Sequence, residues 1–276
     1  MSLLEALILG IVQGITEFLP ISSTAHIVIT SLLLDLPFPG LVMEIFLHLA
    51  SVLAVIIYFR RDLAQIITGF FAFIRYRSPH DKVSFIFSIY IIIATMITGV
   101  LGVILTDFIA ESLKTPPVIA ISLVVTGSLL IFIERFHRYG NKNEETMGLK
   151  DTFVVALGQT LAVIPGISRS GATLVAALWT GLNRETAVRF SFLLAIPVIL
   201  GSTVLLVKDF EPGLVNEIGI IPLVIAFIAS FIFSIIGIIW LIDFLKKSRL
   251  IYFAIYCYIL AAFVYFYLDR SLIIDL

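Results

Sequence analysis

The sequence predicts an all-α, polytopic membrane protein with six transmembrane helices and two re-entrant helical hairpins in an inverted-topology repeat. Three observations support this. First, 60% of the 276 residues are hydrophobic and 13% are charged, whereas soluble domains average about 25% charged residues. Second, several apolar segments are long enough to cross a bilayer. Third, two more are interrupted by prolines, hydroxyls and charges. The composition excludes a soluble enzyme, and no basic tract suggests binding to nucleic acid.

Six segments match the roughly 20 apolar residues that a transmembrane helix needs. They are 42–59, 83–106, 118–136, 188–207, 220–242 and 250–268. Two other apolar regions, 3–36 and 152–187, break in the middle. Pro20 to Thr24 interrupt the first, and Pro165 to Gly171 interrupt the second. Short arms with a polar tip are typical of re-entrant hairpins, whose backbone must be buried in protein or line a cavity.

Positive charge predicts the orientation, because Lys and Arg are enriched in cytoplasmic loops. Most of them flank the cytoplasmic ends of the proposed spans, and only Lys114, Lys208 and Arg270 fall on the other side. We therefore expect the first hairpin to enter from outside, the second to enter from the cytoplasm, and both termini to lie outside. The short apolar segment within 63–77 is flanked by arginines and is interpreted as an interfacial helix on the cytoplasmic face.

Each hairpin is followed by three spans, so 1–136 and 152–276 form the same module in opposite orientations, with 137–151 as a cytoplasmic linker. Sites in inverted repeats form where broken helices of both halves meet near the midplane. We therefore expect the two hairpin tips to meet there. A faint sequence echo at an offset of 146 residues agrees with this repeat: Gln13 with Gln159 and Ser22 with Ser168.

The second tip, Pro165-Gly-Ile-Ser-Arg-Ser-Gly-Ala-Thr173, has the components of a phosphate-binding loop. Its glycines allow close approach of the backbone, and N–H groups at the start of a following helix favour an anion. Arg169 supplies a forked, permanently charged donor, and Ser168, Ser170 and Thr173 supply hydroxyls. The alternative is that these hydroxyls only bond back to helix carbonyls. That alternative leaves the charge of Arg169 without the anionic partner that it needs inside a membrane.

The first tip supplies complementary chemistry. Gln13 and Glu17 are four residues apart and share a helix face. Together they could hold a hard divalent cation, Mg²⁺ or Ca²⁺, that bridges to substrate phosphates. Glu17 could instead act as a base, or simply neutralise Arg169 as a structural ion pair.

His26 follows the hydroxyl cluster Ser22, Ser23 and Thr24. It could act as a general base, a nucleophile or an acid for the leaving group, or it could make an ordinary interhelical hydrogen bond. Glu44 and His48 form another pair four residues apart. They could line the entry to the site, but we favour a buried polar pair and do not count them among the site residues.

At these residues the chain resembles the undecaprenyl-diphosphatase family, the bacitracin-resistance membrane phosphatases. Gln13-xxx-Glu17, continuing through Phe-Leu-Pro-Ile-Ser-Ser-Thr-Ala-His26, matches the family's (E/Q)xxxE element. Residues 165–173 match its PGxSRSxxT element, and the apolar layout agrees over essentially the whole chain. Many members carry Glu where this chain has Gln13, so this chain has one carboxylate fewer at this element than those members.

The resemblance implies hydrolysis of undecaprenyl diphosphate, or a related polyprenyl diphosphate, to the monophosphate and inorganic phosphate. It also implies a divalent cation, an active site facing outward from the plasma membrane, recycling of the lipid carrier for cell-wall polymers such as peptidoglycan, and bacitracin resistance. Carried onto this chain, Gln13 and Glu17 would serve the metal or activate the attacking group, and Ser23 and His26 would provide nucleophile or base. The diphosphate would be held by the polar residues of both tips: Ser22, Thr24, Ser168, Arg169, Ser170 and Thr173.

Three questions stay open on the sequence. The attacking group is Ser23, His26 or water. A homodimer is compatible with the sequence but is not required by it. The main rival function is a transporter or flippase of a phosphorylated lipid or anion, since inverted repeats with broken helices are a carrier architecture. Glu17 and His26 favour the phosphatase, because a simple anion carrier has less reason to place them beside a phosphate.

Overall fold

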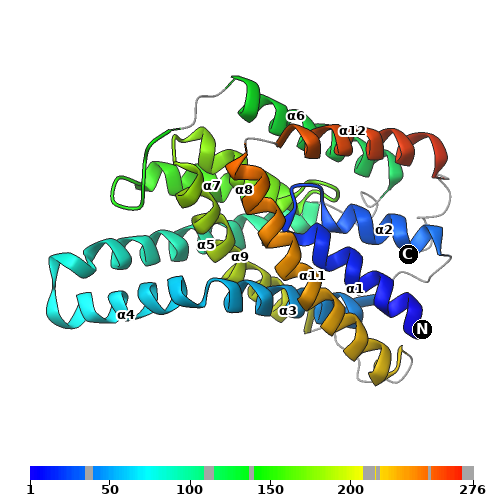
Figure 1. The fold of residues 1–276 in the computed structure, drawn as a ribbon, viewed down its shortest axis with the longest axis horizontal. Helices are drawn as coiled ribbons and strands as arrows, with labels where there is room; N and C mark the ends of the chain where they lie inside the picture. Colours follow the sequence, from blue (N-terminus) through cyan, green and yellow to red (C-terminus); the bar gives the residue numbers. More distant parts are fainter. Residues whose placement is uncertain are drawn as a thin grey trace.

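The computed structural model describes residues 1–34, 40–108, 115–136, 140–207, 215, 218–247 and 250–268, and this part of the chain is built from helices joined by turns (Figure 1). The elements of the first half are α1 (Leu3–Phe18), α2 (Ser23–Leu33), α3 (Gly40–Tyr58), α4 (Arg60–Tyr76), the 3-10 turn η1 (Pro79–Asp81), α5 (Lys82–Phe108) and α6 (Pro116–Phe136). Those of the second half are α7 (Leu149–Thr160), the 3-10 turn η3 (Leu161–Val163), α8 (Arg169–Trp179), α9 (Arg184–Val207), α11 (Ile220–Lys246) and α12 (Leu250–Tyr267).

Every segment predicted to span a membrane is helical. Five helices of the described chain are long and apolar enough to cross a bilayer: α5, α6, α9, α11 and α12. The remaining predicted span, 42–59, corresponds to α3. This helix qualifies as a span only when it is taken together with α4, and the two helices are bent by 75° relative to each other. The structure therefore supports a multi-pass membrane protein.

Both predicted interruptions are present. The first helical segment stops at Phe18 and resumes at Ser23, and the second stops at Val163 and resumes at Arg169. α9 begins at Arg184, earlier than the predicted boundary at 188, because the polar turn after α8 is short. Part of the predicted first hairpin, 35–36, and the C-terminal residues 269–276 lie outside the described residues.

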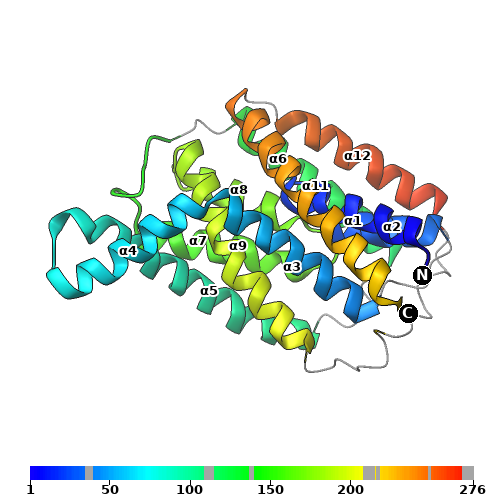
Figure 2. The ribbon, with the colours of Figure 1, turned by 60° about the horizontal axis from the view of Figure 1, so that its bottom comes forward.

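The helices around the two breaks correspond to one another. α8 begins and ends 146 positions after α2 (Ser23 to Arg169, Leu33 to Trp179), and both helices have 11 residues. The packing corresponds as well: α1 lies against α11, whereas α7 lies against α5, and α3 and α9 pack on each other. Figures 1 and 2 show α6 and α12 side by side along one edge of the bundle.

Glycines fix the distance between α1 and α11. A Cβ atom added to Gly10 or Gly14 would lie 2.5 Å from the carbonyl oxygen of Ala226 or Ser230, respectively. Two small residues four apart allow helix backbones to approach closely in membranes. The N-terminal helix is thereby seated directly on a helix of the second half.

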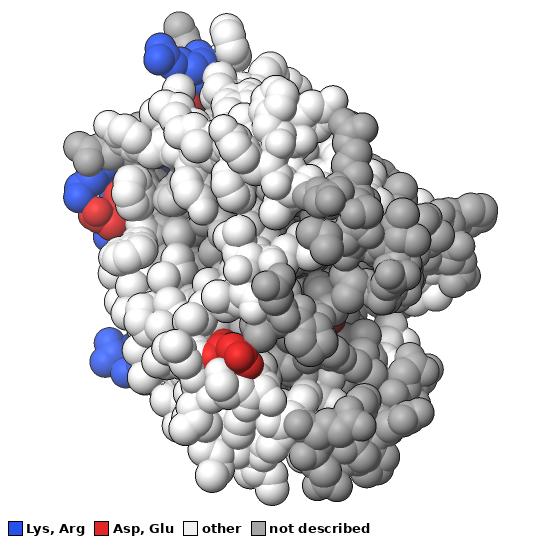
Figure 3. All heavy atoms as spheres, turned by 90° about the vertical axis from the view of Figure 1, so that its right-hand side faces the viewer, with Lys and Arg blue, Asp and Glu red and all other residues white. Residues whose placement is uncertain are grey.

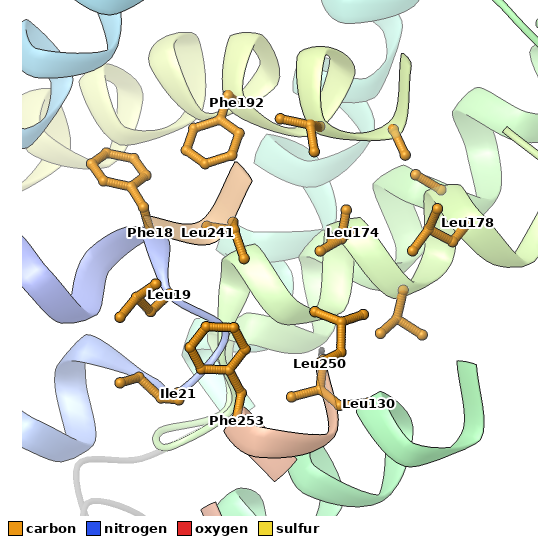
Figure 4. Packing of buried hydrophobic residues seen from close by; sticks show 14 of the residues in the cluster. Phe18, Leu19, Ile21, Leu130, Leu174, Leu178, Phe192, Leu241, Leu250 and Phe253 are labelled. Atoms are coloured by element: carbon orange, nitrogen blue, oxygen red, sulfur yellow. The ribbon is translucent and has the colours of Figure 1, made fainter. Parts of the chain in front are cut away.

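The interior next to the breaks is packed with apolar side chains. Phe18 at the end of α1 stacks on Phe192 of α9, with ring centroids 5.3 Å apart. Figure 4 shows Leu174 and Leu241 in the same cluster, so α1, α8, α9 and α11 converge there. Many large apolar side chains are instead exposed, as on α5 and α12, and the described part of the face in Figure 3 is mostly uncharged. Such a surface suits contact with lipid.

Candidate active site

The first tip is a strained turn. α1 ends at Phe18, and Pro20 prevents its continuation. Ser22 then adopts φ 69° and ψ 101°, a conformation that costs a non-glycine residue about 1–3 kcal/mol. Its hydroxyl accepts a hydrogen bond from the backbone N–H of Ala25 at 3.4 Å and so caps α2. Strained residues of this kind cluster at functional sites.

The second tip uses glycine for its turn. Gly166 has φ 90°, and a Cβ atom there would lie 2.8 Å from the Cβ of Ser122, so both conformation and space require glycine. Ser168 caps α8 by accepting a hydrogen bond from the backbone N–H of Gly171 at 3.1 Å. Arg169 is therefore the first residue of α8, where the helix dipole favours an anion.

The two tips meet at an ion pair between Glu17 and Arg169. The guanidinium Nη2 of Arg169 donates to Glu17 Oε1. Glu17 is 5% exposed, and its Oε2 accepts hydrogen bonds from Gln13 Nε2 at 2.8 Å and from Ser23 Oγ at 2.6 Å. Ser170 Oγ donates to the carbonyl of Leu19 at 3.0 Å and ties the tips together a second time. The predicted convergence of carboxylate and guanidinium is confirmed.

A cavity of about 160 Å³ opens beside this ion pair. Its volume suits a phosphorylated headgroup better than a whole lipid. Its polar lining combines residues of both tips with one residue of α3 and one of α9: Glu17, Ser22, Ser23, Thr24, His48, Ser168, Arg169 and Ser202.

The remaining predicted residues lie around this cavity. Gln13 is 2% exposed and supports Glu17 from the next helical turn. Ser170 and Thr173 line a smaller cavity behind Arg169. The hydroxyl of Thr173 donates to the backbone carbonyls of Arg169 and Ser170, which is the helix back-bonding considered as an alternative for these hydroxyls.

His26 has other partners. Its Nδ1 lies 2.7 Å from the carbonyl oxygen of Ser22, its Nε2 lies 2.7 Å from the hydroxyl of Tyr256, and its ring stacks on that tyrosine. A carbonyl oxygen can only accept a hydrogen bond, so Nδ1 carries a proton and donates it to Ser22; in the neutral ring Nε2 then accepts from the tyrosine hydroxyl. Both ring nitrogens are thus occupied, and His26 is absent from the residues that line the cavity. The geometry favours a structural role, holding the strained Ser22.

His48 lines the cavity but was not among the predicted site residues, and the same is true of Ser202. His48 does not form a self-contained pair with the side chain of Glu44. Its Nδ1 bonds the backbone carbonyl of Glu44 at 2.9 Å, and its Nε2 lies 4.0 Å from Glu17 Oε2. The spacing of Glu44 and His48 places both on one helix, but it does not indicate which face of α3 meets the first tip.

The donor set bears on the predicted divalent cation. No group of three His, Cys, Asp or Glu suited to a metal ion occurs among the described residues. Among the described residues that line the cavity, Glu17 is the one carboxylate, and Gln13 turns its amide nitrogen toward this carboxylate. Mg²⁺ is commonly bound by one or two carboxylates together with substrate phosphates and water. The residues therefore fit a cation that shares its coordination with a bound diphosphate.

Chemically, the site combines a binding group with a proton acceptor. Arg169 and the start of α8 can hold phosphate oxygens. Glu17 accepts the hydrogen bond of the Ser23 hydroxyl, as a base does before removing a proton from a nucleophile. Glu17 is buried and the Arg169 side chain is 18% exposed. Their opposite charges cancel, so the resting site carries no net charge into the membrane.

Comparison with known proteins identifies relatives over the whole chain. Residues 6–263 match the family model described as bacitracin resistance protein BacA. An undecaprenyl-diphosphatase of Halalkalibacterium halodurans is 61% identical over 277 residues, covering 100% of both chains. One from Shouchella clausii is 53% identical over 270 residues, covering 98% of each chain. One from Bacillus cereus is 42% identical over 267 residues, covering 96% of this chain and 97% of the relative. The chain belongs to the BacA family of bacitracin resistance proteins.

Proposed function

We propose that this protein removes the terminal phosphate from undecaprenyl diphosphate, releasing undecaprenyl phosphate and inorganic phosphate. It thereby recycles the lipid carrier of cell-wall polymer synthesis and confers bacitracin resistance. The relatives named undecaprenyl-diphosphatase support this substrate. The observation that carries the proposal is the contact of Ser23 and Arg169 with the two oxygens of a single buried carboxylate, that of Glu17.

Substrate binding begins at Arg169. The diphosphate competes with Glu17 for the guanidinium and lies against the N-terminus of α8, beside Ser168. Ser22 and Thr24 contribute hydroxyls from the first tip. Phosphoryl transfer depends mainly on positioning and on neutralising charge on the equatorial oxygens, which is the contribution of Arg169.

The reaction then has two steps. Glu17 takes the proton of Ser23, and Oγ of Ser23 forms a bond to the terminal phosphorus as the bond to the bridging oxygen breaks. The bridging oxygen leaves with the polyprenyl monophosphate. Water then attacks the phosphorus of the phosphoserine as its bond to Oγ of Ser23 breaks. Oγ takes back the proton held by Glu17, and inorganic phosphate leaves. His26 takes no part, because its nitrogens are engaged by Ser22 and Tyr256.

Glu17, with the amide of Gln13 turned to present its oxygen, would hold a divalent cation together with the diphosphate. Such a cation, Mg²⁺ or Ca²⁺, would add positive charge at the phosphate oxygens. Among the described residues that line the cavity, Arg169 is the only permanent positive charge, so a cation would complement a diphosphate that carries more than one negative charge.

In the membrane, we place the two broken segments as re-entrant hairpins of an inverted repeat. Its six spans are α3 together with the five long apolar helices α5, α6, α9, α11 and α12. The corresponding lengths of α2 and α8 support the repeat. The distribution of Lys and Arg supports a cytoplasmic location for α4 and the linker, with the cavity opening to the outer side and the termini outside. A homodimer remains a prediction.

The test is phosphate release from farnesyl diphosphate and undecaprenyl diphosphate by the purified protein in detergent, where transport cannot occur. We expect turnover and a phosphorylated Ser23 after rapid acid quenching. Absence of phosphate release would favour the flippase or transporter. Turnover without a trapped phosphoserine, combined with activity in Ser23→Ala, would indicate direct attack by water.

A further inference from the structure

A small cavity, whose lining does not include Glu17, lies next to Arg169. Its volume is about 10 Å³, and its lining includes Gln159 of α7, Arg169 of α8 and Ser191 of α9. In each of these residues one polar atom is buried without a hydrogen-bond partner among the described residues. The three atoms are Gln159 Oε1, Arg169 Nη1 and Ser191 Oγ. Unpaired buried polar atoms cost about 1–3 kcal/mol each in general, so three around one cavity need an explanation.

Neighbouring hydrogen bonds fix the direction of the Gln159 amide. Its Nε2 donates to the hydroxyl of Thr98 at 3.2 Å, and that hydroxyl donates to the carbonyl of Ala156 at 3.4 Å. Because the proton of Thr98 is used in this way, Thr98 can only accept from Gln159. Gln159 must therefore present its carbonyl oxygen, an acceptor, toward the cavity.

The three atoms match the bonding capacity of one water molecule. Water can accept from Arg169 Nη1 and donate to Gln159 Oε1 and Ser191 Oγ, which gives the roughly three hydrogen bonds typical of a buried water. A volume of about 10 Å³ is close to that needed for a single water molecule. A phosphate is too large for this cavity, and a cation is excluded by the adjacent guanidinium.

We propose that a single ordered water molecule occupies this cavity and, with Gln159 and Ser191, holds the guanidinium of Arg169 from behind. Gln159 and Ser191 are positioning residues that act through this water. When the diphosphate displaces Glu17 from Arg169, the rear contact keeps the guanidinium directed at the phosphate. This inference rests on the proposed function, because it deepens the role of Arg169 in binding diphosphate.

The internal repeat agrees with the assignment. Gln13 of α1 bonds the charged residue of the first tip, Glu17, directly. Gln159 of α7 lies 146 positions later and lines the same small cavity as the charged residue of the second tip, Arg169. Each broken segment thus places a buried glutamine behind its own charged group.

The experiment measures hydrolysis of farnesyl diphosphate and binding of its non-hydrolysable methylene-bridged analogue by Gln159→Leu, Ser191→Ala and the double variant. We expect each single variant to lower kcat/KM and to weaken analogue binding by about tenfold. The kcat/KM and analogue affinity of the double variant should be no lower than those of the more impaired single variant, because both substitutions remove the same water. In an Arg169→Ala background, Gln159→Leu should not weaken analogue binding further.

Thr203→Val is the matched control. Thr203 lies on the same helix as Ser191, and its hydroxyl is also buried without a partner among the described residues, but it does not line this cavity. We expect its kcat/KM to stay unchanged. Ser191→Ala is the smallest change and keeps the test valid if Gln159→Leu does not fold.

Multiplicative effects of the two substitutions, or variants equal to wild type, would overturn the inference. So would a lowered unfolding temperature with unchanged kcat/KM, which indicates a purely structural role. In all these outcomes the wild-type protein still releases phosphate. Failure of the wild-type protein to do so would instead overturn the proposed function.

Discussion

The two tips are related in sequence position but differ in how their turns are held. The first turns at Ser22, a residue with a side chain and a φ of 69°, whereas the second turns at Gly166, whose φ of 90° costs glycine little. The first is further clamped by His26 between the Ser22 carbonyl and the Tyr256 hydroxyl. The strained tip carries the proton acceptor, Glu17, and the proposed nucleophile, Ser23. The relaxed tip carries the guanidinium of Arg169. One side of the site is therefore built to react and the other to bind.

Charge removal gives the largest expected effect and separates the two roles. Glu17→Gln and Arg169→Ala should each lower phosphate release from farnesyl diphosphate by about 10³-fold or more. Glu17→Gln should still bind the methylene-bridged analogue, because it leaves the guanidinium free for phosphate. Arg169→Ala should bind it poorly. Isothermal titration calorimetry in detergent measures the analogue affinity of both variants. Lys247→Ala, which removes a surface ion pair with Asp243, is the control. Equal analogue affinities in the two variants would contradict the division of roles.

The serines of the two tips should also differ. Ser23→Ala removes the proposed nucleophile and should reduce turnover by about 10²-fold or more. Ser170→Ala removes a hydroxyl that bonds the Leu19 carbonyl, and should reduce turnover by about tenfold. Initial rates over a range of substrate concentrations measure both. A larger loss in Ser170→Ala than in Ser23→Ala would place the nucleophile elsewhere.

The two histidines offer a comparison within the first half. His48→Leu should lower kcat/KM by about tenfold with little change in unfolding temperature, since it faces the cavity beside Glu17. His26→Leu should mainly lower the unfolding temperature, because the carbonyl of Ser22 and the hydroxyl of Tyr256 lose their common partner. Thermal unfolding in detergent and steady-state kinetics distinguish the two. The reverse pattern would restore His26 as the imidazole of the reaction.

The dependence of turnover on Mg²⁺ tests whether the first tip binds a divalent cation with a single carboxylate, that of Glu17. A chelator should abolish turnover, and added Mg²⁺ should restore it. Gln13→Glu supplies a second carboxylate, so half-maximal turnover should need about tenfold less Mg²⁺. Titration of activity with Mg²⁺ measures this. Turnover that persists in the presence of a chelator would contradict the metal site and would indicate that Arg169 alone neutralises the charge of the phosphate.

The turns themselves give the smallest effect. Gly166→Ala should destabilise the protein by about 1–3 kcal/mol, because alanine must adopt a positive φ beside Ser122. Ser22→Gly should change the stability by less than about 1 kcal/mol, since relief of strain offsets the greater entropy of glycine in the unfolded chain. Equal destabilisation in both variants would show that the first tip is not strained.

Residue pattern was sufficient to predict the helical architecture, the two breaks and the meeting of Glu17 with Arg169, since a carboxylate and a guanidinium in apolar segments each require a partner. It was not sufficient for the histidines. Whether His26 or His48 faces the cavity depends on the rotation of α2 and α3 about their axes, which is set by packing across the bundle. The orientation of the Gln159 amide likewise depends on Thr98, a residue 61 positions away on another helix.

The ion pair at the centre of the site also has a consequence for biogenesis. Its two members are 152 residues apart in the chain, and ribosomes add about 5–20 residues per second. Glu17 therefore leaves the ribosome roughly 8–30 s before Arg169. During that interval the nascent first segment carries a carboxylate whose counter-ion has not yet been synthesised. It must stay protonated, or remain at the translocon or the aqueous surface, until the second segment arrives.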